Sequence, residues 1–327
     1  MDVEVTLDSS PSYSFTISAS CDRGDRTTME DRLCVHQGFT KHGMLDYILL
    51  GLFDGHAGVE AAQYAKEVLP IQVDRLLRRG WDEEKALRQA FHDTNELMLE
   101  EMGSWSKSGA IPSRAGTTAC VALLRRDRLW TANCGDSTCV LGVRVGEGTS
   151  WYPAGIRATS PHSLNPQERA RIARDGGQVA MDSRGDPRVV FSWCKRHCWA
   201  RQSRCSHRKR HFPCLNITRS LGDFWSFSSD TGRFAISCDP DIRSFSIADD
   251  NIFALCLHSD GVVLSPAHIV KTMSLTSSEE KENASTFKSD SLASELLIQN
   301  RNCLKSRPDR DNATGIVVLI NQAPTKI

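Results

Sequence analysis

Three β-prone runs lie so close together in this sequence that only short turns can join them. They span residues 117–124, 128–134 and 138–143, and the turns between them carry charged residues and glycine. Strand-like runs joined in this way predict antiparallel meanders. We therefore expect an architecture built from local antiparallel pairs rather than a doubly wound parallel sheet.

Further apolar runs and two helical stretches complete the pattern. Residues 47–53 (YILLGLF) are continuously apolar, as in a buried strand. From Gly58, and again after Gly80, apolar residues recur at the spacing of an amphipathic helix. Antiparallel strands with separate long helices predict an α+β sandwich in one large domain. Other strand-like runs lie at 234–238, 252–258 and 315–320.

The overall composition excludes several classes of protein. With 40 Lys and Arg against 40 Asp and Glu, the chain carries no formal net charge, so we expect neither a nucleic-acid partner nor a membrane surface. No run of about 18 apolar residues predicts a spanning helix, and the first 25 residues lack the apolar core of a signal peptide. The 12 cysteines are therefore expected as reduced thiols in an intracellular protein, nuclear or cytoplasmic.

Acidic residues stand where several predicted strands begin or end. The clusters are Glu30-Asp31, Asp54-Gly55, Asp260-Gly261 and Asp311-Asn312. A fold that gathered them would need a cation, because several carboxylates cannot stay ionised side by side. Oxygen ligands suit Mg²⁺ or Mn²⁺, and two such ions can share a bridging hydroxide that attacks phosphorus. A single Asp-Gly after a strand is most often an ordinary turn, so only the four acidic clusters together indicate a metal site.

Seven short motifs follow one another along nearly the whole chain. They are Arg26-x-x-Met29-Glu30-Asp31, Phe53-Asp54-Gly55-His56, Gly116-Thr117-Thr118-Ala119, Cys134-Gly135-Asp136-Ser137, Thr218-Arg219-Ser220-Leu221-Gly222-Asp223, Ser259-Asp260-Gly261 and Asp311-Asn312-Ala313-Thr314. In this order they resemble the motifs of the PPM-type (type 2C) metal-dependent protein Ser/Thr phosphatases. The resemblance is closest to the delta form, the stress-induced nuclear member, through residues 60–65, residues 222–227 and a basic insertion upstream of the latter.

This resemblance implies a four-layer αββα sandwich with a dinuclear metal site at one edge, and a role for each site residue. Arg26 would hold the substrate phosphate with its planar guanidinium. His56 would be the general acid that protonates the leaving Ser or Thr oxygen, without a phosphoenzyme. The metal ligands, direct or through water, would be Asp54 (bridging), the Gly55 carbonyl, Asp260, Asp311, Glu30 and Asp31, with Asp136 on a weak third ion.

Three positions depart from the family pattern. Ala57 replaces the first glycine of Gly-Gly, which is tolerable unless the backbone there needs a positive φ. Leu264 stands where a carboxylate usually assists the third metal, which predicts a weak third site. In the flap, the family's Asp-His-Lys-Pro becomes Ser160-Pro161-His162-Ser163. The last change leaves the core metal pair untouched but puts the flap's behaviour in doubt.

A basic segment between Arg188 and Arg219 carries nine Lys and Arg and no acidic residue. We interpret it as a clamp that selects acidic or multiply phosphorylated substrates. A solvated loop, a zinc site formed by its Cys and His residues, and a nucleic-acid or nuclear-import patch remain alternatives. The proposed substrate-binding residues are Lys195, Arg196, Arg208, Lys209 and Arg210.

We therefore expect one catalytic domain over residues 1–327, with a flap and basic insertion at about 160–215 and a polar loop at about 276–290. The expected partners are phosphoprotein substrates, and the chain is expected to be a monomer. The main alternative is a catalytically weak, phosphatase-like scaffold that binds phosphoproteins without turnover. The presence of every core acidic residue argues against that alternative.

Overall fold

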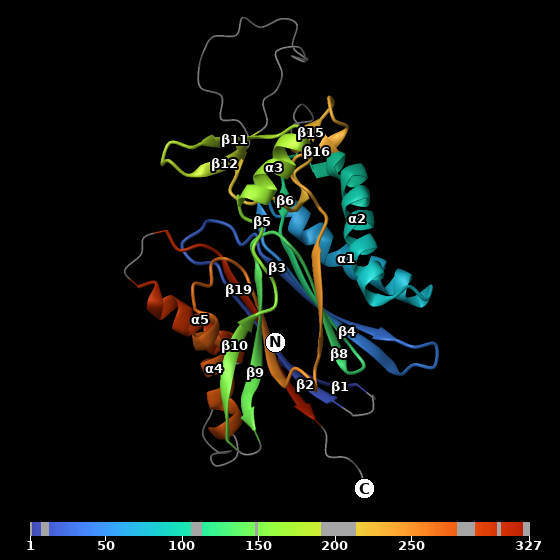
Figure 1. The fold of residues 1–327 in the computed structure, drawn as a ribbon, viewed down its shortest axis with the longest axis vertical. Coiled ribbons are helices and arrows are strands. Elements are labelled where there is room, and N and C mark those ends of the chain that lie inside the picture. Colours follow the sequence, from blue (N-terminus) through green and yellow to red (C-terminus); the bar gives the residue numbers. More distant parts are fainter. Residues whose placement is uncertain are drawn as a thin grey trace, which may run out of the picture.

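Two antiparallel sheets stacked face to face form the centre of the structure (Figure 1). The computed structural model describes residues 2–7, 13–105, 113–147, 150–190, 214–279, 292–305 and 309–322. In spatial order, the six-stranded sheet contains β1 (Asp2–Leu7), β2 (Tyr13–Asp22), β19 (Ala313–Gln322), β18 (Ile252–His258), β9 (Thr138–Glu147) and β10 (Ser150–Arg157). The five-stranded sheet contains β17 (Asp241–Ser246), β8 (Arg128–Cys134), β7 (Ala119–Arg125), β4 (Leu45–Phe53) and β3 (Arg32–Phe39).

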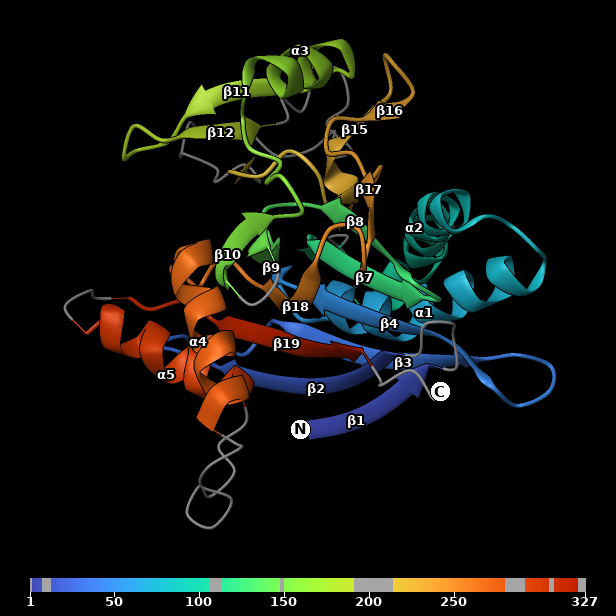
Figure 2. The ribbon, with the colours of Figure 1, turned by 60° about the horizontal axis from the view of Figure 1, so that its bottom comes forward.

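A pair of helices covers the outer face of each sheet, which gives four layers (Figure 2). Helices α1 (Glu60–Arg78) and α2 (Glu83–Glu101) pack on the five-stranded sheet. Helices α4 (Pro266–Glu279) and α5 (Leu292–Cys303) pack on the six-stranded sheet. The predicted αββα sandwich is confirmed, with one apolar core between the sheets and one beneath each helix pair.

Strand β4 shows why the run YILLGLF contains no polar residue. Successive side chains in a strand point to opposite faces. Ile48 and Leu50 enter the core between the sheets, whereas Tyr47 and Leu49 enter the core under α1 and α2. Both faces of β4 are buried, and the strand carries the chain directly to Asp54 at its end.

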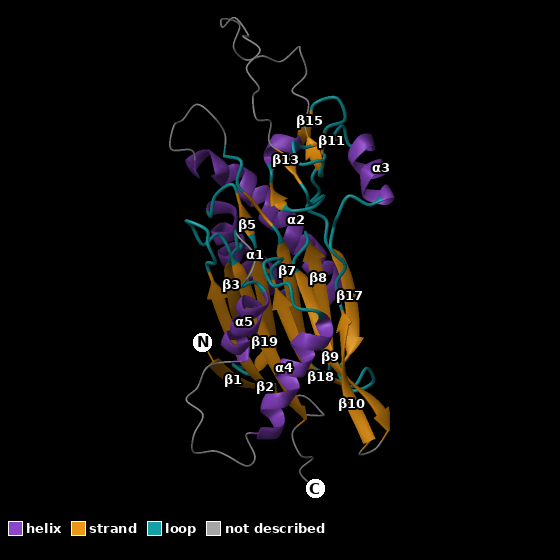
Figure 3. Ribbon diagram, turned by 90° about the vertical axis from the view of Figure 1, so that its left-hand side faces the viewer, coloured by secondary structure: helices purple, strands orange, loops and turns teal. Residues whose placement is uncertain are grey.

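A smaller subdomain, the flap, lies above one end of the sandwich (Figure 3). It is built from α3 (Pro166–Arg174) and a sheet of β11 (Gln178–Met181), β12 (Pro187–Val190) and β13 (Cys214–Leu215). Its small core contains Ile172 and Val189. The short elements near this end are β5 (Gly55–His56), β6 (Gly116–Thr117), β14 (Leu221–Gly222), β15 (Phe227–Ser228), β16 (Arg233–Phe234), and the 3₁₀ turns Met102–Trp105 and Phe224–Ser226.

Some sequence expectations were wrong in detail. The runs at 128–134 and 252–258 are strands with the same bounds, but only Arg233–Phe234 is a strand near the predicted 234–238. Buried Ala235 and Ile236 instead pack in the flap core. Helix α4 extends to Glu279 and so includes the start of the predicted polar loop, whose remainder lies mostly outside the described residues. Among the described helices, none is long and apolar enough to cross a membrane.

Candidate active site

An acidic pocket of about 520 Å³ opens at the end of the sandwich that faces the flap. Its carboxylates come from the ends of strands: Asp54 follows β4, Asp260 follows β18 and Asp311 precedes β19. Each of the four acidic clusters expected from the sequence places a carboxylate in this pocket, and Asp136 adds a fifth, whereas Asp31 does not line it. The pocket is lined by Glu30, Asp54, Asp136, Asp260 and Asp311 together with Gly55, His56 and Arg26.

The backbone around Asp54 is fixed by the neighbouring Gly116-Thr117-Thr118 segment. The Asp54 amide donates to Thr118 Oγ1 at 3.2 Å, and the Asp54 carbonyl accepts from the Thr118 amide at 2.9 Å. Strand β5, immediately after Asp54, pairs with β6. These bonds explain why two motifs more than 60 residues apart act as one structural unit.

Burial and mutual repulsion make these carboxylates hard to ionise together. Burial, followed by the charges of Asp31, Asp260 and Asp136, raises the pKa of Asp54 well above its usual value. Burial also raises the pKa of Asp31 to about 6 and that of Asp136 to about 7. Asp31 is buried beside the pocket, where Ser259 Oγ donates to its Oδ2 at 3.0 Å.

The donor set fits a hard divalent cation. Within the described residues, no Lys, Arg or His forms an ion pair with Glu30, Asp54, Asp136 or Asp260. Several carboxylate oxygens without cationic partners are the ligands that Mg²⁺ or Mn²⁺ prefers. No three such side chains in the described part of the chain already form a coordination group.

His56 is held by a buried carboxylate that sequence reasoning did not assign to the site. Its Nε2 lies 2.7 Å from Asp223 Oδ2, and Asp223 also accepts from Trp225 Nε1 at 2.7 Å and from Ser220 Oγ. Burial lowers the pKa of His56, but the charge and hydrogen bond of Asp223 outweigh it and raise that pKa overall. Asp223 is the last residue of the sequence motif at 218–223, but the sequence alone did not indicate that it contacts His56.

Gly116 makes this contact sterically possible. A Cβ at Gly116 would lie 2.4 Å from His56 Nε2 and 2.2 Å from Asp223 Oδ2. Any side chain there would push the imidazole and the carboxylate apart. The glycine is therefore required by the close approach of the His56–Asp223 pair.

Arg26 lies at the mouth of the pocket and is paired with a carboxylate of the cluster. Its Nη2 is 2.6 Å from Asp311 Oδ2, and its side chain is more than half exposed. The loop that carries it is tied to the start of β19, because the Asp25 amide donates to the Arg310 carbonyl at 2.9 Å. Arg26 is thus a cation at the entrance that can turn toward an incoming anion.

Comparison with known proteins decides the family. The family model described as "Protein phosphatase 2C" matches residues 15–302. The chain belongs to the protein phosphatase 2C family. A Toxoplasma gondii structure titled as serine-threonine phosphatase 2C has the same fold, with a TM-score of 0.72 and 21% identity over 98% of this chain and 99% of that one.

Sequence relatives in this family differ in length. "Probable protein phosphatase 2C 3" of Paramecium tetraurelia is 27% identical over 94% of this chain and 93% of its own. "Protein kinase and PP2C-like domain-containing protein" of Oryza sativa subsp. japonica is 27% identical over 96% of this chain, which spans only 40% of that protein's length. These relatives carry general family names, so the likeness to the delta subtype stays a prediction.

Two departures from the family pattern acquire a physical meaning in the structure. Ala57 has φ = 57°, in the left-handed region, where the methyl group of alanine is sterically unfavourable. Leu264 is buried in the apolar core under α4 and α5 and does not line the pocket. A carboxylate placed at Leu264 would therefore enter that core rather than the pocket.

The basic segment joins the flap beside the pocket. The five proposed substrate-binding residues, Lys195, Arg196, Arg208, Lys209 and Arg210, lie outside the described residues, as do most of the Cys and His residues of the zinc alternative. Both ends of the segment are described, because Val190 of β12 pairs with Cys214 of β13. Arg188, Leu215 and Ile217, next to those ends, line the pocket.

Proposed function

We propose that this chain is a metal-dependent protein phosphatase that hydrolyses phosphoserine and phosphothreonine. The observation that carries the proposal is one pocket, in a chain of the protein phosphatase 2C family, that combines five carboxylates, an entrance arginine and a carboxylate-bound histidine. A pocket rich in carboxylates repels a phosphate ester unless cations neutralise it. The substrate therefore enters only together with a divalent metal.

Asp54, Asp260, Asp311 and the Gly55 carbonyl would hold Mg²⁺ or Mn²⁺, with Glu30 and Asp31 acting directly or through waters and Asp136 on a weaker third ion. When bound, such ions supply a water activated as a nucleophile at neutral pH. Arg26 binds the phosphate oxygens and orients the ester, a role that its half-exposed position near Asp311 supports. Direct attack by water leaves no phosphoenzyme.

His56 is proposed as the general acid, and the structure suggests which nitrogen donates. Nε2 is occupied by Asp223 at 2.7 Å, so Nδ1 is the nitrogen that can release a proton to the leaving Ser or Thr oxygen. Asp223 raises the pKa of His56, which favours the protonated imidazole that a general acid requires. Asp223 is buried and holds the ring orientation through the cycle.

Substrate selection is proposed to come from the basic segment. The described ends of the segment support this proposal, because Arg188 and Leu215, beside the paired residues Val190 and Cys214, line the pocket. Replacing Lys195, Arg196, Arg208, Lys209 and Arg210 by Ala should raise KM for acidic or doubly phosphorylated peptides and leave kcat on p-nitrophenyl phosphate unchanged. The difference should shrink as salt rises, since the Debye length is about 8 Å at physiological strength. Unchanged peptide kinetics at low salt would leave the segment a solvated loop.

The compartment is also a proposal. The nine cysteines that the structure describes are free thiols, which fits the reducing interior of a cell, nuclear or cytoplasmic.

The decisive experiment is an assay of phosphate release from p-nitrophenyl phosphate and a phosphothreonine peptide after EDTA treatment, with and without added Mn²⁺. We expect no turnover in EDTA and recovery with Mn²⁺. Phosphopeptide binding without turnover at any Mn²⁺ concentration would instead establish the scaffold alternative. Turnover that persists in thoroughly metal-stripped protein would refute the metal role.

A further inference from the structure

The turn that carries Asp136 is clamped from two sides. It joins β8 to β9, and Gly135 adopts φ = 118°. On one side it packs on Thr118: a Cβ at Gly135 would lie 2.6 Å from Thr118 Cβ, and Ser137 Oγ bonds Thr118 Oγ1 at 2.8 Å. The other side is held by a residue of the flap connection that departs from the family pattern.

That residue is His162, which binds Gly135 with both its backbone and its side chain. The His162 amide donates to the Gly135 carbonyl at 2.9 Å, and the Gly135 amide donates to His162 Nδ1 at 3.0 Å. Asn133 Nδ2 adds a bond to the same carbonyl at 3.1 Å. The side chain of His162 is 5% exposed, so water does not compete for these bonds.

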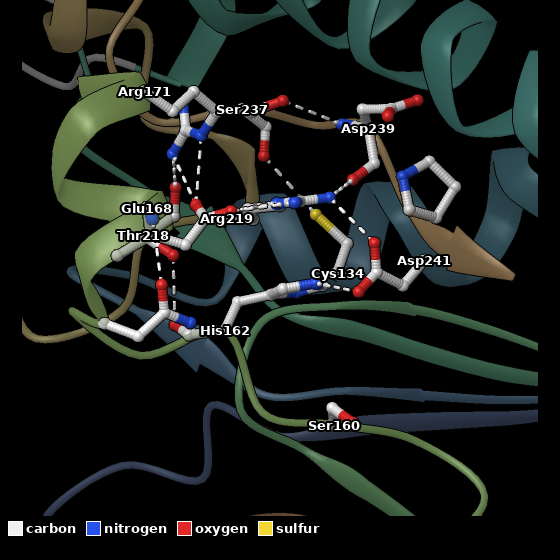
Figure 4. Close-up of polar contacts among 12 residues, drawn as sticks. Cys134, Ser160, His162, Glu168, Arg171, Thr218, Arg219, Ser237, Asp239 and Asp241 are labelled. Atoms are coloured by element: carbon white, nitrogen blue, oxygen red, sulfur yellow. Dashed lines mark hydrogen bonds and ion pairs between the residues drawn. The ribbon is translucent and has the colours of Figure 1, made fainter. Parts of the chain in front are cut away.

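The ring also connects this turn to the flap (Figure 4). His162 Nε2 lies 3.1 Å from Asp241 Oδ2, and Arg219 Nη1 donates to Asp241 Oδ1 at 3.1 Å. Arg219 Nη2 in turn donates to Glu168 of α3 at 2.7 Å. The Thr218 amide and hydroxyl, next to Arg219, both donate to the His162 carbonyl. The chain of contacts runs from α3 to the residue before Asp136.

These contacts define the protonation state of the ring. Nδ1 accepts a hydrogen bond from an amide, so it carries no proton, and the single proton of the neutral ring lies on Nε2, which is buried 3.1 Å from Asp241 Oδ2 without forming a hydrogen bond. Burial, with the charge of Arg219 adding to it, lowers the pKa of His162 and agrees with a neutral imidazole. A proton on Nδ1 would break the hydrogen bond that the Gly135 amide donates to this nitrogen.

We propose that His162 is a positioning residue for Asp136: its neutral imidazole fixes the Gly135–Asp136 turn and joins that turn to helix α3 of the flap. This inference rests on the proposed function, in which Asp136 is a ligand of the weaker metal ion. Outer partners that orient a metal ligand typically change metal affinity by about 10–100-fold when removed. His162 acts in this way through the backbone, without touching substrate or metal.

The tautomer is tested on the unaltered protein. Long-range ¹H–¹⁵N spectra of protein labelled at histidine nitrogen distinguish the two tautomers and the imidazolium, and the His162→Asn variant identifies the signal. At pH 7 we expect an unprotonated Nδ1 and a protonated Nε2. A protonated Nδ1 would overturn the proposal, because the Gly135 amide could not then donate to it.

The matched variants are His162→Asn, which keeps an acceptor at the δ position, and His162→Leu, which removes it. Mn²⁺ binding is followed by electron paramagnetic resonance, without substrate, and hydrogen exchange of a peptide containing Gly135 is followed by mass spectrometry. His162→Leu should weaken the lower-affinity Mn²⁺ site about 10–100-fold and speed Gly135 exchange. His162→Asn should stay within about threefold of the unaltered protein on both measures. Equal losses in both variants would show that the ring only fills space and would overturn the inference.

Asp136→Asn separates this inference from the proposed function. If Asp136→Asn leaves Mn²⁺ binding unchanged, the assignment of Asp136 as a ligand is wrong. If Asp136→Asn weakens binding and a folded His162→Leu does not, the ligand role stands and the positioning role is wrong. Circular dichroism checks the fold of each variant, and the tautomer measurement decides the question if His162→Leu does not fold.

Discussion

The acidic pocket and the flap base, where Glu168 of α3 contacts Arg171 and Arg219, both contain buried carboxylates. The two regions differ in whether neighbouring side chains neutralise those carboxylates. In the pocket, Asp54 is surrounded by other acids, and its pKa is raised. At the flap base, burial alone would raise the pKa of Glu168, but hydrogen bonds and charges of Arg219 and Arg171 lower it to about 2. Glu168 has arginine partners within the protein, whereas Asp54 has no ion-pair partner among the described residues. This difference supports the proposal that the pocket binds a cation.

The largest expected effect comes from removing a charge in the pocket. Asp54→Asn should reduce kcat with Mn²⁺ by at least about 10³-fold, because it removes the proposed central ligand of the metal ions. In EDTA the same variant should melt at a higher temperature than the unaltered protein, because one repelling charge is gone. Activity assays and thermal melts check both effects. A variant that melts lower in EDTA would mean that Asp54 is already satisfied without metal.

The second effect concerns His56, the proposed general acid. His56→Ala should reduce kcat by about 10²–10⁴-fold on an alkyl ester such as a phosphoserine peptide. The loss should be much smaller on p-nitrophenyl phosphate, because its leaving group departs without a proton. Parallel steady-state assays on the two substrates give the ratio. Equal losses would assign His56 a structural role only.

Removing a charge from the flap base should lower the stability of the fold, whereas the preceding substitutions act mainly on activity. Glu168→Gln should lower the free energy of unfolding by about 2–3 kcal/mol at pH 7, because the depressed pKa is lost and two arginines lose their partner. This contribution is fully present above the unfolded pKa of 4.5 and disappears as pH falls through about 2. The gap between the two proteins in urea unfolding should therefore close between pH 4.5 and 2.

A matched control for this comparison is Glu100→Gln on the exposed surface of α2, which should change stability by less than about 0.5 kcal/mol at every pH. A gap for Glu168→Gln that stays constant down to pH 2 would show that shape, and not charge, holds the flap base together.

The smallest effect tests backbone strain beside the pocket. Ala57→Gly should raise stability by about 0.5–1 kcal/mol, because a left-handed φ of 57° is unfavourable for alanine. Ala62→Gly, in the first turn of α1, should change stability in the opposite direction, since it removes a buried methyl group and glycine is a poor helix former. Thermal or urea unfolding of the pair measures both signs. A loss of stability in both variants would contradict the strain.

The sequence predicted the sheets and the pocket better than the flap. The run before Asp54 is apolar on both faces, so its strand character and its end are encoded locally. Helix α3 has one large apolar side chain, Ile172, and was missed, because its position depends on contacts such as those of Arg171 with the Ala235 and Thr218 carbonyls. Such contacts join segments far apart in the chain and leave no periodic signal.

Within the site, the motifs named the acidic residues but could not show what each one faces. Asp223 stood in a quoted motif, yet its bond to His56 depends on a fold that brings residues 167 positions apart together. Ala57 was expected to be tolerable unless the backbone needs a positive φ, and the sequence does not display that φ, which is 57° in the structure. Leu264 was interpreted as a changed ligand, but burial under α4 decides its role.

The pairing of Val190 with Cys214 has a consequence for how this enzyme family could diversify or be engineered. Two chain ends held side by side can accept segments of very different length, since doubling a flexible loop costs only about 0.6 kcal/mol in closure entropy. Residues 191–213 could therefore be exchanged for an unrelated recognition sequence while the pocket, anchored on other strands, keeps its geometry. Substrate specificity could then be changed by exchanging this one segment, without altering the residues of the pocket.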